Sequence, residues 1–267
     1  MEENGAMYYF CFGLLYAVIF MFGAVIGSFL NVCIYRLPKE ESLIKVNSHC
    51  MSCGAFIQKR DLIPIFSWIM LRGKCRNCKA KIAGRYPLVE SLNAVFYVLI
   101  FAYYGIMERP IEAVICCLLF SALIVVFFMD LDTQLISMYV VGFIGILGVL
   151  RTVLDFMNEG SSALMSHGIG LLTGFVPLAL IVFLSGERAM GWGDAWLMLA
   201  GGLFLGVKQL VPALFIGLAV GCVFGVIHKV RTGDSKFAFG PYLSIGIAAA
   251  VFVGEYISDW YLALCGF

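Results

Sequence analysis

Two closely spaced cysteine pairs are the strongest chemical signal in this sequence. They read Cys50-Met-Ser-Cys53 and Cys75-Arg-Asn-Cys78, with 21 residues between them. Each CxxC turn lets two thiolates reach one ion, and two such turns complete a tetrahedron. The spacing predicts a structural zinc site without an open position for hydrolysis. Two local disulfides are the alternative, and the adjacent His49 is an alternative ligand.

Two aspartates at the ends of apolar runs suggest a second chemistry. Asp130 ends one run, and Asp194 opens another within Gly191-Trp192-Gly193-Asp194. Ionisable residues at membrane depth are costly and are candidates for function. The two glycines remove side chains beside the carboxylate, so that a peptide strand can approach. Paired carboxylates share one proton, and such a pair activates water and polarises a scissile carbonyl.

Other polar residues near the apolar runs have simpler interpretations. Asp132 is a single acid at the end of a run, where its side chain can reach the membrane interface. No Ser–His arrangement competes with the aspartates, because His167 falls on the outer side in the predicted topology, Cys50 beside His49 belongs to the predicted metal site, and His228 has no evident nucleophile neighbour. The sequence therefore favours aspartic over serine or cysteine hydrolysis.

Composition predicts a polytopic membrane protein. The 267 residues are 62% apolar and 13% charged, whereas soluble domains usually carry about 25% charged residues. Eight apolar runs predict an all-α fold of about eight transmembrane helices in a lipid bilayer. The predicted helices cover residues 7–32, 88–106, 111–129, 135–156, 163–184, 194–205, 210–227 and 239–257.

The distribution of basic residues predicts the topology. Between Arg36 and Arg85 lie 11 of the 18 Lys and Arg residues, with only three acidic residues. Basic loops remain in the cytoplasm, so this segment is expected inside and the N-terminus outside. Asp130 and Asp194 then face the cytoplasm. The connection 228–236, which includes Lys236, is also basic and fits this arrangement.

Three parts follow from this organisation. Residues 1–33 are the first transmembrane helix, 34–87 a small cytoplasmic zinc-binding insertion, and 88–267 a core of seven helices. The net charge of +1 gives no reason to expect a nucleic acid partner.

Several segments, in their order and spacing, resemble the bacterial prepilin peptidases, also called type IV leader peptidases. The two aspartates match the family pair, and Gly191 to Asp194 match its GxGD element. Ser137-Met138 stands where the family often has Pro-Asp, and Trp196 where a Lys often follows. The other matching segments are Gly27-Ser28-Phe29-Leu30-Asn31-Val32, Asp61-Leu62-Ile63-Pro64, Leu71-Arg72-Gly73-Lys74-Cys75-Arg76, Arg85-Tyr86-Pro87-Leu88-Val89-Glu90 and Phe239-Gly240-Pro241.

The resemblance implies an aspartic endopeptidase of the bacterial inner membrane, with Asp130 and Asp194 as its catalytic residues. Its substrates would be type IV prepilins or pseudopilins, which have a short basic leader, a glycine before the cut and an apolar helix after it. The resemblance also implies N-methylation of the new N-terminus with S-adenosylmethionine.

Two other classes compete with this interpretation. Presenilin-type and signal-peptide-peptidase-type proteases also use GxGD, and Pro212-Ala213-Leu214 spells their PAL tripeptide. It begins 18 residues after Asp194, at the outer end of the predicted seventh helix, which is the wrong face. A non-enzymatic transporter or assembly scaffold with a structural zinc site is the second alternative, and it would tolerate loss of the aspartates.

Overall fold

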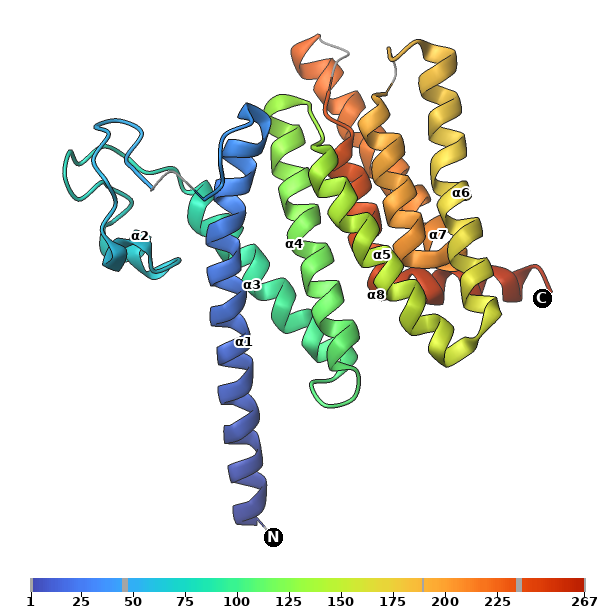
Figure 1. Cartoon of the computed structure of the whole chain (residues 1–267), viewed down its shortest axis with the longest axis horizontal. Coiled ribbons are helices and arrows are strands. Elements are labelled where there is room, and N and C mark those ends of the chain that lie inside the picture. The colour runs from blue at the N-terminus through green and yellow to red at the C-terminus, as the bar shows by residue number, and fades with distance from the viewer. Residues whose placement is uncertain (1, 45–47, 189, 234–236, 267) are drawn as a thin grey trace. The chain divides into compact units, whose positions relative to one another are not determined.

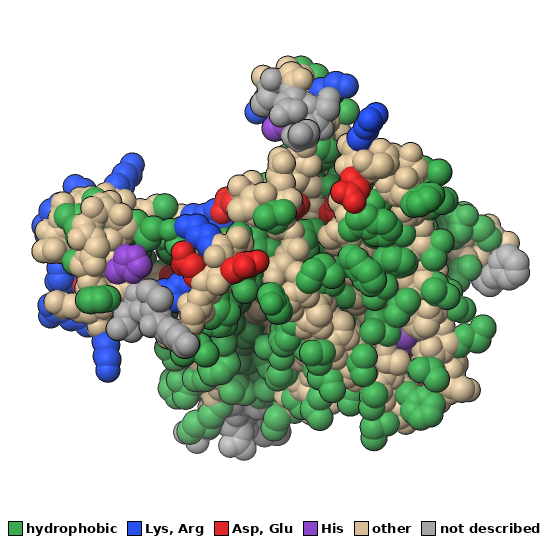
Figure 2. Space-filling view, turned by 45° about the horizontal axis from the view of Figure 1, so that its top comes forward, with side chains coloured by type: hydrophobic (Ala, Val, Ile, Leu, Met, Phe, Trp, Pro, Cys, Tyr) green, Lys and Arg blue, Asp and Glu red, His purple; other side chains and the backbone are tan. Residues whose placement is uncertain are grey.

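The computed structural model describes residues 2–44, 48–188, 190–233 and 237–266. Helices dominate these residues, which contain two isolated bridges and no named strand. Seven helices are long and apolar enough to cross a membrane, which confirms the all-α polytopic fold (Figure 1). Many apolar side chains lie on the face shown in Figure 2, as lipid-facing helices require. The seven are α1 (Glu2–Arg36), α3 (Arg85–Tyr104), α4 (Pro110–Thr133), α5 (Met138–Glu159), α6 (Ser161–Ser185), α7 (Trp192–Thr232) and α8 (Gly240–Leu264).

The chain forms two compact units, Met1–Ser121 and Ala122–Phe267, and the boundary falls within α4. The first unit contains α1, α3 and the cysteine-containing insertion between them. The second contains the helices that carry both aspartates. Lys45 and Lys236, which contribute to the predicted charge bias, lie outside the described residues.

In the first unit, α1 packs against α3 with almost no space between the backbones. A Cβ atom added to Gly23 would lie 2.7 Å from Ala94 Cα, and one added to Gly27 would lie 2.7 Å from Glu90 Cα. The four-residue spacing places both glycines on one face of α1. Small residues at such spacing allow close helix contact in lipid, where hydrophobic association is weak.

A buried polar network links helices of the first unit. The Asn93 side-chain amide donates to the Gly23 carbonyl at 2.7 Å, and the Ser121 hydroxyl donates to Asn93 Oδ1 at 2.9 Å. The Tyr97 hydroxyl lies 3.0 Å from Ser121 Oγ and donates to it, since the single Ser121 proton is already used. These hydrogen bonds pair polar groups that would otherwise be costly in the apolar interior.

The insertion between α1 and α3 is small and irregular. It contains two short 3₁₀ turns, η1 (Leu37–Lys39) and η2 (Lys59–Leu62), and one short helix, α2 (Phe66–Met70). An isolated bridge pairs His49 with Phe56, and another pairs Lys74 with Lys81. Its backbone hydrogen bonds are mostly those of short local turns, and such a segment with little regular structure is consistent with stabilisation by a metal.

In the second unit, α7 changes direction at Gly206. The helix has 41 residues, but Gly206 has φ 70° and ψ 169°, which are not helical values. An unbroken helix of this length would measure about 60 Å, twice the thickness of the hydrocarbon layer. A Cβ atom added to Gly202 would lie 3.0 Å from Leu210 Cδ2, so the chain folds back at the break. The arms 192–205 and 207–232 correspond to the predicted sixth and seventh spans.

The break frees a backbone carbonyl that side chains from two other helices then satisfy. His167 Nδ1 lies 2.8 Å from the Leu203 carbonyl oxygen, and the Thr152 hydroxyl lies 3.4 Å from the same oxygen. The other ring nitrogen of His167 lies 3.1 Å from Asp155 Oδ2. The buried His167 thus has a structural role at the helix break, because hydrocarbon offers no water to the exposed backbone.

Helix α8 runs antiparallel to the second arm of α7. Near the start of α8, a Cβ atom added to Gly246 would overlap the Ala213 carbonyl oxygen of α7 and lie 2.9 Å from Gly217 N. Toward the end of α8, the Gln209 side-chain amide donates to Glu255 Oε1 at 2.9 Å. The start of α8 is therefore directed back toward the end of the unit where α7 begins.

We expect Gly246→Ala to lower the unfolding free energy by about 1–3 kcal/mol, because the added methyl group meets backbone that cannot easily move. The measurement is the thermal midpoint of the purified protein in detergent. Gly145→Ala is the matched control, since an added Cβ atom there has nothing within 4 Å. Equal midpoints for the two variants would contradict the close contact between α7 and α8.

Candidate functional site

Asp130 lies near the end of α4, and its carboxylate meets the start of α8. The side chain is buried, with 5% of the residue exposed. The Gly240 backbone N–H donates to Asp130 Oδ2 at 2.9 Å. Gly240 is the first residue of α8, so the carboxylate accepts one of the amides that have no partner within the helix. The positive end of the helix dipole also favours an anion there.

Asp194 lies at the start of α7, in its first turn. Its Oδ2 accepts the Gly191 N–H at 3.3 Å, and its own N–H donates to the Gly191 carbonyl at 3.2 Å. The Asp194 side chain thus satisfies the amide of the N-cap residue Gly191, whose own lack of a side chain leaves only a backbone bond in return. The other oxygen, Oδ1, is buried and has no hydrogen-bond partner among the described residues. A buried carboxylate oxygen without a donor is unfavourable unless a proton, water or substrate group meets it.

Ile136, in the link between α4 and α5, lies between the start of α7 and the start of α8. A Cβ atom added to Gly193 would lie 3.0 Å from Ile136 Cβ. One added to Gly240 would lie 3.0 Å from Ile136 Cδ1 and 2.8 Å from Asp130 Oδ2. Ile136 thus lies against both Gly193, the neighbour of Asp194, and Gly240, whose amide binds Asp130. The structure therefore brings both sequence-predicted aspartates to one place.

The two glycines of the GxGD element have different surroundings. Gly193 has Ile136 against its α-carbon, so its missing side chain gives room to the α4–α5 link. Gly191 is exposed, and an added Cβ atom would find nothing closer than 4.0 Å. Asp132, two residues after Asp130, is exposed, as expected for a side chain that reaches the interface.

Gly240 and Ile136 contribute to this site, although sequence reasoning did not single them out as site residues. Gly240 is followed by a proline at the start of α8, which is typical of a helix N-terminus. That pattern predicts where a helix begins, but not which carboxylate its first amide meets 110 residues away.

The four cysteines of the insertion converge on one point. Their sulfur atoms all lie within 4.8 Å of one another, and Cys50 Sγ is 3.8 Å from Cys78 Sγ. Two thiolates at metal distances of about 2.3 Å in a tetrahedron are separated by about 3.8 Å. His49 is not part of this cluster. The geometry fits one metal ion held by four thiolates.

Each cysteine pair lies in a tight turn of the same design. The Cys50 N–H donates to the Ala55 carbonyl at 2.9 Å, and the Cys75 N–H donates to the Ala80 carbonyl at 2.8 Å. Amides of Ser52 and of Cys53 lower the pKa of the Cys50 thiol to about 6, whereas, despite the amide of Ala80, desolvation and the other cysteine side chains raise the pKa of the Cys78 thiol to about 11. The four sulfur atoms therefore do not all ionise readily by themselves, and a bound cation would favour the thiolate form that binds metal.

An ion pair joins the second turn to η2. Arg76 Nε donates to Asp61 Oδ2 at 2.8 Å, and its terminal nitrogen donates to Oδ1 at 2.7 Å. This Arg76 contact holds the pKa of the Asp61 carboxyl below its usual range. A bidentate pair also fixes orientation, so it aligns the second cysteine turn with the residues that lead into α2.

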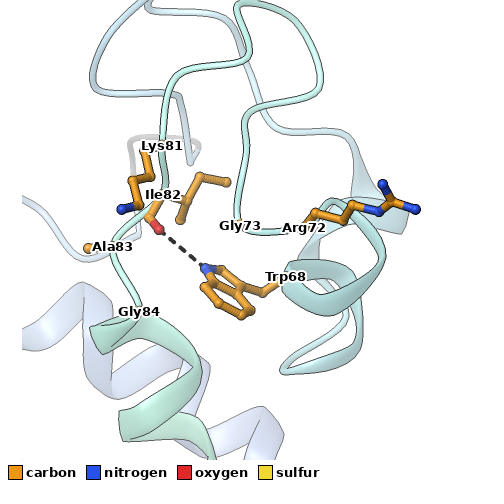
Figure 3. A pocket seen from close by; sticks show the side chains of 7 residues that line it. All are labelled: Trp68, Arg72, Gly73, Lys81, Ile82, Ala83 and Gly84. Carbon is orange, nitrogen blue, oxygen red and sulfur yellow. Dashed lines mark hydrogen bonds between the residues drawn. The ribbon is translucent and has the colours of Figure 1, made fainter.

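A cavity of about 580 Å³ opens beside the second cysteine turn. The Trp68 indole N–H donates to the Ile82 carbonyl at 3.3 Å across it, and the side chains of Arg72 and Lys81 lie on opposite sides (Figure 3). A Cβ atom added to Gly73 would lie 2.9 Å from the Trp68 ring. The cavity therefore has an aromatic wall, and its described lining residues include two cations, Arg72 and Lys81, and no acid.

Two protein-family models match this chain, one in its N-terminal part and one in its C-terminal part. Residues 21–104 match the Bacterial Peptidase A24 N-terminal domain, and residues 117–226 match the Type IV leader peptidase family. The prepilin leader peptidase/N-methyltransferase of Aeromonas salmonicida is 30% identical over 94% of each chain. The type 4 prepilin-like proteins leader peptide-processing enzyme of Escherichia coli is 32% identical over 86% of this chain and 91% of its own.

A third relative, the prepilin leader peptidase/N-methyltransferase of Neisseria gonorrhoeae, is 33% identical over 84% of this chain and 85% of its own. No solved structure matches the chain. The similarity to these enzymes extends over both the insertion and the helices that carry the two aspartates. The chain therefore belongs to the type IV leader peptidase family.

Proposed function

We propose that this multi-pass inner-membrane protein is an aspartic endopeptidase that removes the leader from type IV prepilins or pseudopilin-like precursors. The observation that carries the proposal is the convergence, around Ile136, of two buried carboxylates from different helices, Asp130 and Asp194. Family membership supplies the substrate class, because three quoted relatives are named for prepilin leader processing.

The pair is proposed to hydrolyse the peptide bond with one shared proton. One carboxylate takes a proton from water, whose oxygen attacks the scissile carbonyl carbon, while the protonated partner donates a hydrogen bond to the carbonyl oxygen. The leaving amine then receives a proton from the pair. The Gly240 amide orients Asp130, and the unpartnered Oδ1 of Asp194 is available for water or substrate.

The charge distribution supports a cytoplasmic location for this chemistry. The basic insertion is expected inside, and α4 ends and α7 begins on the same side in the predicted topology. A prepilin held inside by its basic leader would present its cleavage site there. The N-terminus of the chain would then be outside.

Neither alternative class, a presenilin-type or signal-peptide-peptidase-type protease or a non-enzymatic transporter or scaffold, is supported. Ala213 of the Pro-Ala-Leu tripeptide is fully buried against Gly246 of α8, where it serves helix packing just after the α7 break. A transporter or scaffold would not need the convergent aspartates, and the quoted relatives are named as enzymes.

We expect Asp130→Asn and Asp194→Asn each to reduce leader cleavage at least about 100-fold, because an amide can neither take nor give the shared proton. Cleavage is measured by co-expressing a prepilin and determining the mass of its N-terminus. Asp132→Asn is the matched control, since Asp132 is exposed at the same helix end. Normal processing by either variant of the pair, at normal protein level, would exclude the aspartic mechanism.

We expect Gly193→Ala to slow cleavage on the order of 10- to 100-fold, because the new methyl group meets Ile136 and displaces the carboxylates. Gly191→Ala should have a much smaller effect, since its surroundings are open. Adding Ile136→Ala to Gly193→Ala should restore part of the rate. Equal loss in the two alanine variants, without rescue, would show that Ile136 does not transmit the effect.

We infer that the metal of the cysteine cluster is zinc and that its role is structural. Four thiolates in a tetrahedral arrangement suit Zn²⁺, and they leave no open position for a catalytic water. Such a site contributes folding free energy to a segment with little regular structure of its own.

We expect Cys50→Ser to lower bound zinc well below one ion per chain and to make the insertion sensitive to protease. Zinc is measured by mass spectrometry of the purified protein, and proteolysis by the appearance of fragments cut between α1 and α3. Cys222→Ser is the control, because Cys222 is exposed and lies far along the chain in α7. Unchanged zinc content in Cys50→Ser would contradict ligation by four cysteines.

N-methylation of the new N-terminus is the second activity we propose, since two quoted relatives are named as N-methyltransferases. The methyl donor S-adenosylmethionine carries one carboxylate and two positive groups. The cavity beside Trp68 is large enough for a ligand of this kind. Its two cationic side chains suit the carboxylate but oppose the sulfonium and ammonium groups, so it does not fit the donor well, and no step is assigned to it.

A further inference from the structure

The short helix α2 presents an apolar face away from the rest of the insertion. Phe66, Ile69 and Met70 are 56%, 59% and 67% exposed, and their spacing places them on one side of the helix. The other side is fixed inward, because the Ser67 hydroxyl donates to the Arg60 carbonyl at 3.0 Å. Leu62 and Ile63, just before the turn that leads into α2, are also exposed and add apolar surface near this face.

A hydrogen bond from Ile65 sets the depth of this face. The Ile65 N–H donates to Glu90 Oε2 at 2.7 Å, and Glu90 lies five residues after Arg85, the start of α3. That distance is about 7.5 Å along the helix axis, comparable to the thickness of the headgroup layer on one side of a bilayer. The α2 helix therefore begins level with the first turns of a membrane-spanning helix, rather than beyond its end.

The backbone at this point is held in an uncommon conformation. Ile65 has φ 61°, a left-handed value that is unfavourable for a β-branched residue. Glu90 is buried, and the absence of a side chain on Gly27 lets its backbone approach α1. The Glu90 carboxylate thus anchors a strained turn whose effect is to present Phe66 and its neighbours at this depth.

Charge around α2 complements an anionic surface. Between residues 59 and 81 lie seven basic residues, all exposed, and one acid, Asp61, which is paired with Arg76. Figure 2 shows Lys and Arg side chains gathered over the insertion. Arg72 and Lys81 flank the open cavity beside Trp68, where no acidic residue opposes them (Figure 3). This arrangement suits lipid phosphate groups and would repel the basic leader of a prepilin.

We propose that the α2 face, residues 62–70, inserts into the interfacial layer of an anionic bilayer while the surrounding basic residues contact lipid phosphates. An apolar face with basic residues beside it is the pattern of interfacial membrane helices. The insertion is then attached to the membrane along its length and not only through α1 and α3. This inference depends on the chain spanning a membrane and is independent of peptidase activity.

The test places the photoreactive analogue p-benzoylphenylalanine at Phe66 in the full chain, reconstituted in vesicles of phosphatidylglycerol and phosphatidylcholine. After illumination, mass spectrometry should find lipid attached to position 66 at a yield similar to that at Phe22, which is exposed in the middle of α1. The same analogue at Phe56, which is 72% exposed in the first cysteine turn, should give at least several-fold less lipid adduct. Zinc content confirms that each labelled protein is folded.

Three results would overturn the proposal. They are a lipid yield at Phe66 no higher than at Phe56, attachment of Phe66 to another polypeptide, or attachment to a second copy of the chain.

A second measurement tests whether the basic residues contact lipid phosphates. At Phe66, phosphatidylglycerol adducts should exceed that lipid's share of the vesicle at least about twofold, and Arg72→Gln with Lys81→Gln should remove the excess. The proposed phosphate contacts would be excluded if the share of phosphatidylglycerol among the adducts equalled its share in the vesicle, both in the unsubstituted protein and in the variant.

Discussion

The arrangement of the second unit depends on how two carboxylates are kept inside an apolar protein. Burial of an ionised side chain is costly unless hydrogen bonds or a shared proton compensate. Each aspartate meets the beginning of a helix: Asp130 accepts an amide of α8, and Asp194 caps α7. These contacts require α8 to start beside the end of α4, and Ile136 maintains the spacing. Helix ends, rather than helix faces, therefore build the site.

The sequence predicted much of this structure because its strongest signals are local. Two CxxC pairs predict a four-sulfur cluster, and the sulfur atoms do converge within 4.8 Å. Uncharged runs predict where helices cross a membrane, and seven such helices are present among the described residues. The sequence predicts that one helix ends at residue 205 and the next begins at residue 210, which places the break correctly. The chain reverses there at one residue, Gly206, rather than through a loop.

The contacts that shape the site were not predictable in the same way. The Gly240 amide meets Asp130 across 110 residues of sequence, and no local pattern records such a pairing. Ile136 looks like an ordinary apolar residue in a short link. The role of His167 was also hidden, because its partner, the Leu203 carbonyl, needs a side-chain donor only where the helix is broken. Tertiary packing decides these features, whereas periodicity and composition decide the helices.

The Gly206 reversal also bears on the lipid around the protein. The arm 192–205 that carries Asp194 has fourteen residues and measures about 21 Å, whereas the hydrocarbon layer is about 30 Å thick. Its two ends therefore cannot reach both edges of that layer. With Asp194 at one edge, Gly206 lies about 18 Å further along the axis and so about 12 Å short of the other edge. Either the bilayer becomes thinner beside this arm, or longer neighbouring helices shield its end. In the first case, this hydrophobic mismatch would make the enzyme sensitive to the acyl-chain length of its host membrane.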